Sequence, residues 1–215
     1  YSGGPWTNEP YQAINYVSAH DNYTLWDKLQ LSCEGRSKEE ILAINKLCAA
    51  IVFTSQGIPF IQAGEEFARS KMGDHNSYKS SASINKLDWK RVKEYSDLVN
   101  YYKGLIEIRK NFSAFRDPTT SAGNRIQWLS TPGTQQIAYS LTNNVSGEWS
   151  RVVCLFNASS NGTTINLPSG NWVIIANDTK AGVESLGTAS GSVQLPGRSA
   201  MILVEKNSFD NTVIG

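Results

Sequence analysis

The sequence has few cysteines, few histidines and no excess of charge of either sign. Its 215 residues include three cysteines and two histidines, and 20 basic residues balance 19 acidic ones to a net charge of +1. Cys33, Cys48 and Cys154 are widely spaced and contain no CxxC pair, which excludes a disulfide framework or a cysteine-rich zinc site and favours reduced thiols. The even charge balance gives no electrostatic footprint for nucleic acid, so we expect no nucleic-acid partner.

Long apolar runs are also absent from the sequence. No stretch reaches the roughly 20 residues that span a bilayer, and the first residues, YSGGPWTNEP, have neither the basic nor the apolar region of a secretory signal. We therefore expect no membrane partner, and the compartment, cytoplasmic or secreted, is left open. With 40% hydrophobic and 18% charged residues, the composition is that of a globular protein with one large or two small domains.

The first half of the chain combines helical periodicity with two short apolar runs. Ser37 with Glu40 three residues later is a capping-box pattern that opens one predicted helix, and a second helix is predicted over 94–110. The runs 14–18 and 58–63 have the length and the flanks of buried strands. This order of elements predicts part of an α/β fold with parallel strands.

The second half is punctuated by Gly, Ser, Thr, Asn and Pro between short alternating runs. Short strands are predicted at 125–129, 137–141, 151–157, 163–167, 172–177, 192–195 and 199–205. Strands at this spacing indicate an antiparallel sandwich or barrel. We place a boundary between Asn111 and Asp117 and predict one domain over residues 1–112 and a second over 113–215.

The two histidines stand in different contexts. In INYVSAHDNYTLWDKL, which begins at Ile14, His20, Asp21 and Asn22 follow a predicted strand and precede a helix. A His-Asp pair in such a place is, taken alone, more often part of an ordinary loop than of a catalytic site. His75, in KMGDHNSYKSS, has no HExxH pattern and no second histidine nearby that would support a metal site.

Several linked motifs in the same order resemble a known family. INYVSAHDN, KLCAAIVFTSQGIPFIQAGEEFARSK, HNSY and LDW resemble the C-terminal part of the catalytic barrel of type I pullulanases, debranching members of the α-amylase family of glycoside hydrolases. The resemblance covers about residues 10–112, and the rest is similar in kind to the sandwich domain that follows the barrel. It implies an α/β plus all-β fold: strands 7 and 8 of a (β/α)8 TIM barrel with their helices, then an antiparallel β-sandwich.

The resemblance also implies a function and a set of site residues. The intact protein would cleave α-1,6-glucosidic branch points in pullulan, limit dextrins or related α-glucans with retention. His20 and Asp21 match the family's transition-state-stabilising residues, since hydrogen bonds to ring hydroxyls that strengthen as oxocarbenium charge develops lower the barrier. Asn22, Asn76 and Tyr78 are candidate substrate contacts.

The family's nucleophilic Asp and acid/base Glu come from strands four and five, and neither is in the sequence. We therefore expect the 215-residue chain alone to be inactive and the remaining N-terminal part of the barrel to be its partner. A substitute pair of Asp21 with Glu65 or Glu66 would lie in open water. Glu65 and Glu66 are instead expected in a helical turn with Arg69 as an ion-pair partner. No cofactor is implied; many relatives bind calcium, but no Asp-rich loop here encodes a site.

Other interpretations of the sequence stay open. The chain could be a carbohydrate-binding or structural accessory module, or belong to a protein with isoamylase, branching-enzyme or α-amylase specificity. The tryptophans bear on the first of these, because an exposed indole can stack on a sugar ring. Core packing is the commoner case, and we predict it for Trp89, Trp128, Trp149 and Trp172.

Overall fold

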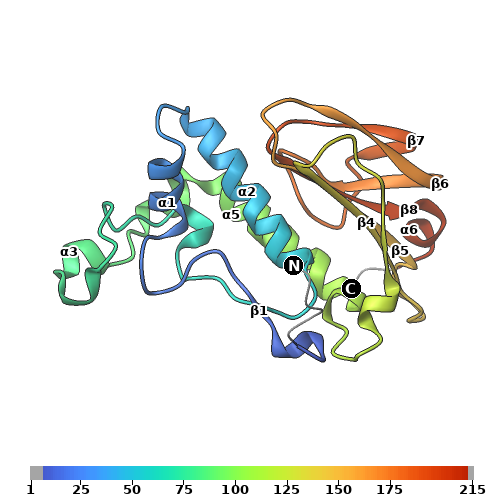
Figure 1. The fold of residues 1–215 in the computed structure, drawn as a ribbon, viewed down its shortest axis with the longest axis horizontal. Coiled ribbons are helices and arrows are strands. Elements are labelled where there is room, and N and C mark those ends of the chain that lie inside the picture. Colours follow the sequence, from blue (N-terminus) through green and yellow to red (C-terminus); the bar gives the residue numbers. More distant parts are fainter. Residues whose placement is uncertain (1–6, 213–215) are drawn as a thin grey trace.

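A layer of helices lies beside an antiparallel sheet in the structure of the chain, a computed structural model that describes residues 7–212 (Figure 1). The helices are α1 (Leu25–Ser32), α2 (Lys38–Thr54), α3 (Ala82–Asn85), α4 (Lys90–Glu94), α5 (Ser96–Asn111) and α6 (Lys206–Asn211). Short 3-10 turns span Pro10–Gln12, Glu65–Phe67, Ser77–Lys79, Ser113–Arg116 and Ala122–Arg125. The long helices α2 and α5 lie side by side between the remaining loops and the sheet.

Helix α2 begins where the capping box predicts. The Ser37 hydroxyl accepts from the Glu40 amide at 3.2 Å, and the Glu40 carboxylate accepts from the Ser37 amide at 3.1 Å. These two bonds satisfy amides that a helix start leaves without intrahelical partners. Helix α5 covers Ser96–Asn111, close to the predicted range, and both helices turn an apolar face into a shared core.

The predicted strands of the first half are parallel but short. Strand β1 (Ile14–Asn15) pairs in parallel with β2 (Ile58–Pro59), and α1 and α2 lie between them in the chain. The parallel arrangement is confirmed, whereas each strand ends after two residues. Ile14, Ile58 and Phe60 are exposed, so this pair lacks the covered faces that a buried strand requires.

The turn from α2 into β2 is held by one buried guanidinium. Arg109 of α5 donates to the carbonyls of Phe53 and Ser55 at 2.8 and 2.7 Å, and to that of Gly57 at 2.7 Å. Gly57 has a φ of 101°, and a β-carbon there would lie 2.8 Å from the Ala13 carbonyl oxygen. Only glycine fits this approach of β2 to the preceding chain.

The second half forms one six-stranded sheet in the order β3-β4-β5-β8-β6-β7, with all neighbours antiparallel. Its strands are β3 (Ile126–Trp128), β4 (Gln136–Thr142), β5 (Arg151–Asn157), β6 (Thr163–Ala176), β7 (Gly187–Leu195) and β8 (Ser199–Glu205). β5 and β8 have the predicted bounds. Two predicted strands are joined in the long β6, whose pairing with β7 shifts between Asn166 and Asn171.

Both faces of this sheet carry apolar side chains. Val152, Cys154 and Phe156 of β5 face the helices and belong to the same core as α2 and α5. A second cluster, here called the far-face core, comprises Ala138, Val153, Leu155, Ile165, Leu167, Trp172, Leu195, Met201 and Leu203. Because it includes the first half of β6 and the end of β7, that part of the hairpin folds over the far face and gives the sheet a sandwich-like second layer.

The tryptophans divide between core and surface. Trp149 and Trp172 are buried as predicted, and the Trp172 indole donates to the Pro168 carbonyl at 3.0 Å. Core packing is wrong for Trp128, which is 69% exposed on the edge strand β3 and packs only one side against Tyr139. It is also wrong for Trp89, which is 65% exposed beside Phe67. Trp128 lies on an edge strand and Trp89 at the start of the short helix α4, and no neighbouring layer covers either one. The local sequence pattern does not show this.

Candidate functional site

His20 and Asp21 lie in the loop between β1 and α1, with their side chains open to solvent. The imidazole Nε2 and the Asp21 Oδ2 are 3.6 Å apart, and the side chains are 89% and 82% exposed. The loop ends at Thr24, whose hydroxyl accepts from the Asp27 amide and starts α1. The two predicted site residues therefore project from a loop that an N-capped helix follows.

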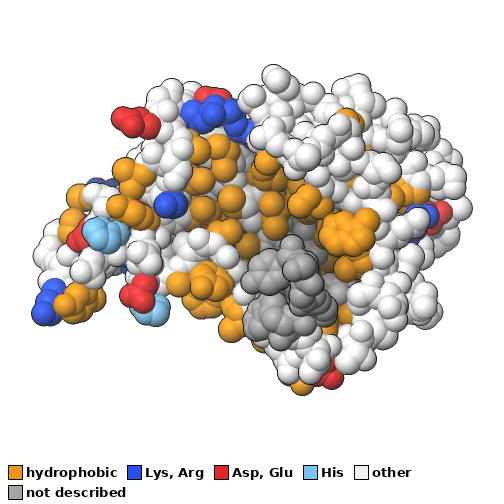
Figure 2. All heavy atoms as spheres, in the orientation of Figure 1, with side chains coloured by type: hydrophobic (Ala, Val, Ile, Leu, Met, Phe, Trp, Pro, Cys, Tyr) orange, Lys and Arg blue, Asp and Glu red, His pale blue; other side chains and the backbone are white. Residues whose placement is uncertain are grey.

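A second loop, after β2, meets this one. A pocket of about 240 Å³ is lined by His20, Asp21, His75, Asn76, Ser77, Tyr78 and Asn85. The structure thus brings His20 and Asp21 together with Asn76 and Tyr78, while Asn22 lies next to the pocket without lining it. Figure 2 shows both histidine side chains at the surface of the helical part, away from the sheet.

The loop after β2 is ordered by polar contacts of its own. The Asn85 side-chain amide donates to the carbonyls of Ser77 and Ser80 at 2.7 and 3.1 Å. Asp74 accepts from the Asn76 amide at 2.9 Å and from the Ser80 hydroxyl, and these bonds lower the pKa of its carboxyl. His75, which we predicted to have no metal role, packs its ring 5.5 Å from that of Tyr23 and so ties the two loops together.

Sequence reasoning missed the side chains that hold the first loop from below. Lys71 is 1% exposed, and its ammonium donates to the carbonyl of Asn22 at 2.7 Å and to that of His20 at 3.3 Å. Asp27 of α1, also buried, accepts from the Lys71 amide at 2.7 Å and from the Ser70 hydroxyl at 2.6 Å. A lysine in the polar stretch ARSKMGDH is expected to be exposed, and no feature of the sequence predicts its burial.

Glu65 is a buried carboxyl beneath the same loops rather than part of the pocket. It accepts from the Ser18 hydroxyl at 2.6 Å, and the Tyr102 hydroxyl lies 3.0 Å from it and 3.0 Å from the Asn45 side-chain oxygen. Burial raises the pKa of Glu65 despite these hydrogen bonds. The expected 3-10 turn is present at Glu65–Phe67, but Arg69 donates to the carbonyls of Ala63 and Asn85 instead of forming the expected ion pair with a glutamate.

The pocket can bind hydroxyl groups but offers no second carboxylate for bond cleavage. Asp21 is its only acidic lining residue among those described, and Glu65 is directed toward Ser18 and Tyr102. An exposed carboxylate, an imidazole, an amide and a phenol together supply both donors and acceptors for a polyhydroxylated ligand. The arrangement therefore fits sugar binding better than acid–base cleavage.

Other chemistry finds little support in residues 7–212. No three His, Cys, Asp or Glu side chains there come together in a way that could hold a metal ion. Burial raises the pKa of the Cys48 thiol to about 11 and that of Cys154 to about 12, so both are poor nucleophiles at neutral pH. No helix in the described part of the chain has the length and apolar character of a membrane span.

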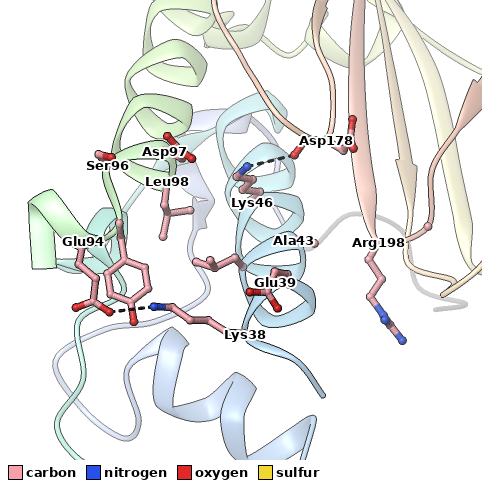
Figure 3. A pocket seen from close by; sticks show the side chains of 13 residues that line it. Lys38, Glu39, Ala43, Lys46, Glu94, Ser96, Asp97, Leu98, Asp178 and Arg198 are labelled. Atoms are coloured by element: carbon pink, nitrogen blue, oxygen red, sulfur yellow. Dashed lines mark hydrogen bonds and ion pairs between the residues drawn. The ribbon is translucent and has the colours of Figure 1, made fainter. Parts of the chain in front are cut away.

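A second groove, of about 320 Å³, lies where α2 and the start of α5 meet the sheet's loops at Asp178 and Arg198 (Figure 3). Its cations already have protein partners: Lys38 bonds to Glu94 at 2.9 Å, Lys46 to the Asp178 and Thr179 carbonyls at 3.3 Å each, and Arg198 pairs with Glu40. Its tyrosine, Tyr95, is buried under Lys38 and offers no open ring face. We interpret this groove as the seam between the two layers.

Comparisons with known proteins find pullulanases and glycogen debranching enzymes. The model of the pullulanase all-beta domain matches residues 124–180. Pullulanase from Bacillus subtilis strain 168 is 38% identical over 166 residues, which are 77% of this chain and 23% of that protein.

Two solved structures show the same relationship. Pullulanase from Bacillus acidopullulyticus matches 93% of this chain and 25% of its own, with 37% identity and a TM-score of 0.89. The type I pullulanase of Bacillus subtilis strain 168, solved with maltose, matches 93% of this chain and 28% of its own, with 32% identity and a TM-score of 0.86. The chain thus spans about a quarter of the length of these relatives. By sequence and by fold, it belongs to the type I pullulanase family of glycoside hydrolases.

Proposed function

We propose that this chain is the part of a debranching hydrolase that binds the sugar ring at the cleaved bond. The whole protein would hydrolyse α-1,6-glucosidic branch points in pullulan, limit dextrins or related α-glucans with retention. The observation that carries the proposal is the pocket in which His20 and Asp21, from the loop after β1, meet Asn76 and Tyr78, from the loop after β2. Maltose in the Bacillus subtilis relative is consistent with such a ligand.

Each residue has a role that its chemistry permits. The Asp21 carboxylate accepts hydrogen bonds from two vicinal hydroxyls, and the His20 imidazole donates to a third. Both bonds strengthen as positive charge develops on the sugar ring, and this lowers the barrier. Asn76 and Asn22 offer amide contacts, and the exposed Tyr78 ring offers a face on which a neighbouring glucose unit can stack.

We also propose that β1 and β2 are strands 7 and 8 of a (β/α)8 barrel, with the division between barrel and sandwich at residues 112 and 113. The parallel β1–β2 pair, joined through α1 and α2, supports this assignment. Apolar side chains left open on this pair, including Ile14, Tyr16 and Phe60, are those that the remaining N-terminal part of the barrel would cover. That part is therefore the proposed partner.

Cleavage itself would depend on residues outside the chain. A retaining enzyme needs two carboxyl groups about 5 Å apart across the bond, whereas the pocket has Asp21 alone among its described lining. We expect the purified 215-residue chain to release no reducing sugar from pullulan. Turnover that Asp21→Ala abolishes would contradict this and would place the complete site within the chain.

The test of the proposed function uses the His20 imidazole as its reporter. Titrating maltotriose into the chain should shift the imidazole NMR signals of His20, and Asp21→Asn should reduce that shift strongly because it weakens the acceptor of the sugar hydroxyls. Asp210→Asn, an exposed carboxylate of α6, is the matched control, and cellotriose tests for the α-linkage. No shift of His20 at millimolar maltotriose, or an equal shift in Asp21→Asn, would contradict the proposal.

One observation favours a second candidate, a carbohydrate-binding accessory module. Trp128 exposes an indole face on the edge strand β3. It lies near the C-terminal end of α2, since the neighbouring Tyr139 donates to the Thr54 carbonyl. The same titration tests this alternative. If maltotriose shifts the indole NMR signal of Trp128 and not the signals of His20, the accessory module is favoured over the barrel site.

A further inference from the structure

We propose that Lys71 is a positioning residue for the glucan site, a role that rests on the proposed function of the pocket. Its buried ammonium holds the backbone of His20, Asp21 and Asn22, so that the side chains of the first two face the loop of Asn76 and Tyr78. The lysine cannot touch a ligand, because its side chain is covered. It acts on the site only through the main chain of the loop.

Among residues 7–212, no other group donates a hydrogen bond to the main chain of this loop. Within the described part of the chain, the two bonds from Lys71 are the only hydrogen bonds made to the main chain of residues 16–23. The ladder between β1 and β2 ends before this segment, and the α1 cap begins after it. Asn22 sits between these ends with a φ of 62°, a left-handed conformation that a side chain adopts at a cost. The ammonium bond to the Asn22 carbonyl is therefore placed to maintain it.

The lysine is itself anchored at its base. The Asp27 carboxylate of α1 accepts from the Lys71 amide and, through its other oxygen, from the Ser70 hydroxyl. The side chain thus starts from a fixed point on α1 and ends on the carbonyls of the loop. An ammonium has three donors, and two acceptors at 2.7 and 3.3 Å define its direction. These contacts of Lys71 with Asp27, His20 and Asn22, here called the Lys71 clasp, join the loops after β1 and β2, the two loops that form the pocket.

If Lys71 only stabilised the fold, replacing it would change the melting temperature and not the local order of residues 20–22. Replacing a buried cation with an apolar side chain of similar length can leave the fold as stable as before, because the cost of burying the charge disappears with it. A positioning role instead predicts local loosening of residues 20–22 in a chain whose melting temperature changes little. These two readouts separate the roles.

The test compares Lys71→Met with wild type and with Lys103→Met, a matched change on the exposed face of α5. ¹⁵N relaxation should give order parameters near about 0.85 for Asp21 and Asn22 in wild type and in Lys103→Met, and below about 0.6 in Lys71→Met. Maltotriose affinity, read from the His20 signals, should fall about tenfold in Lys71→Met, the factor expected when the loosened loop loses one hydrogen bond to the sugar.

Each outcome decides a different point. An unchanged order parameter in Lys71→Met overturns the proposal, and so does a loosened loop with unchanged maltotriose affinity. If wild type itself shows no maltotriose shift, the proposed function fails, while the order parameters still decide whether Lys71 holds the loop. Should Lys71→Met not fold, the wild-type ammonium signal replaces it: slow exchange and a through-bond coupling to the Asn22 carbonyl support the clasp, and the rapid exchange of a solvated lysine overturns it.

Discussion

The sheet and the helical part of this chain are stabilised in different ways. Every residue of β8 from Ser199 to Val204 is buried, because the helices cover one face of the sheet and the folded-over hairpin covers the other. The β1–β2 pair has two residues in each strand and exposed apolar side chains. The sheet is therefore covered on both faces, whereas the loops that carry the pocket depend on single polar side chains for their shape.

The largest expected effect comes from the far-face core. Trp172→Ala removes a fully buried indole and its bond to the Pro168 carbonyl, and should lower the free energy of unfolding by about 3–5 kcal/mol. Phe60→Ala, at a side chain that is 43% exposed beside β2, should cost below about 1 kcal/mol. Urea unfolding of both variants measures the two losses. Equal losses would show that the two regions do not differ in the way described.

A smaller effect is expected where the two regions touch. A β-carbon on Gly104 of α5 would lie 1.9 Å from the Ala181 carbonyl oxygen, in the loop between β6 and β7. Gly104→Ala should therefore push this loop away and cost about 1–3 kcal/mol, even though alanine favours the helix. Gly123→Ala, where a β-carbon meets nothing within 4 Å, is the control. A Gly104→Ala chain as stable as the control would mean that the loop does not rest on α5.

The smallest effect concerns the buried carboxyl below the pocket, and it depends on pH. Because burial raises the pKa of Glu65, the folded chain keeps this proton at pH values where the unfolded chain has lost it. Stability therefore falls as pH rises from the ordinary glutamate range through the raised value. Glu65→Gln, which mimics the protonated form toward Ser18 and Tyr102, should lose this slope and gain on wild type as pH increases.

Thermal melts at several pH values would measure that difference. Glu107→Gln, on the exposed face of α5, should run parallel to wild type throughout. A wild-type advantage over Glu65→Gln that grows with pH would reverse the sign and indicate that the carboxylate is stabilised in the fold. Such a result would also make the buried network beneath the pocket a source of stability rather than a cost.

Local patterns predicted much of the fold. The capping box of Ser37 and Glu40 marked the start of α2, and short apolar runs marked β5 and β8 to the residue. These features depend on neighbours in the chain, which a sequence displays directly. The lengths of β1 and β2 were overestimated, because a strand lasts only as far as its partner pairs with it, and that information lies elsewhere in the molecule.

The pocket was only partly accessible to sequence reasoning. His20, Asp21, Asn76 and Tyr78 were named from motifs, and the structure brings them together. Lys71 and Asp27 were not, since their importance comes from burial and from bonds to main-chain carbonyls that any residue can supply. The exposure of Trp128 was missed for a related reason: whether a strand residue is covered depends on where the neighbouring layer ends.

The short turn that follows α2 limits how freely this sheet could be exchanged for that of a relative. Thr54 accepts from Tyr139 of β4, and Gln56 donates to the carbonyls of Ala114 and Ala122 beyond the end of α5. The Ser113 amide, next to the proposed division, donates to Glu148 in the β4–β5 hairpin. A chimera spliced at residue 112 would replace the partners of Thr54 and Gln56 but keep Ser113 and Glu148 in one segment, so a transplanted sheet would need its own equivalent of Tyr139 to seat correctly.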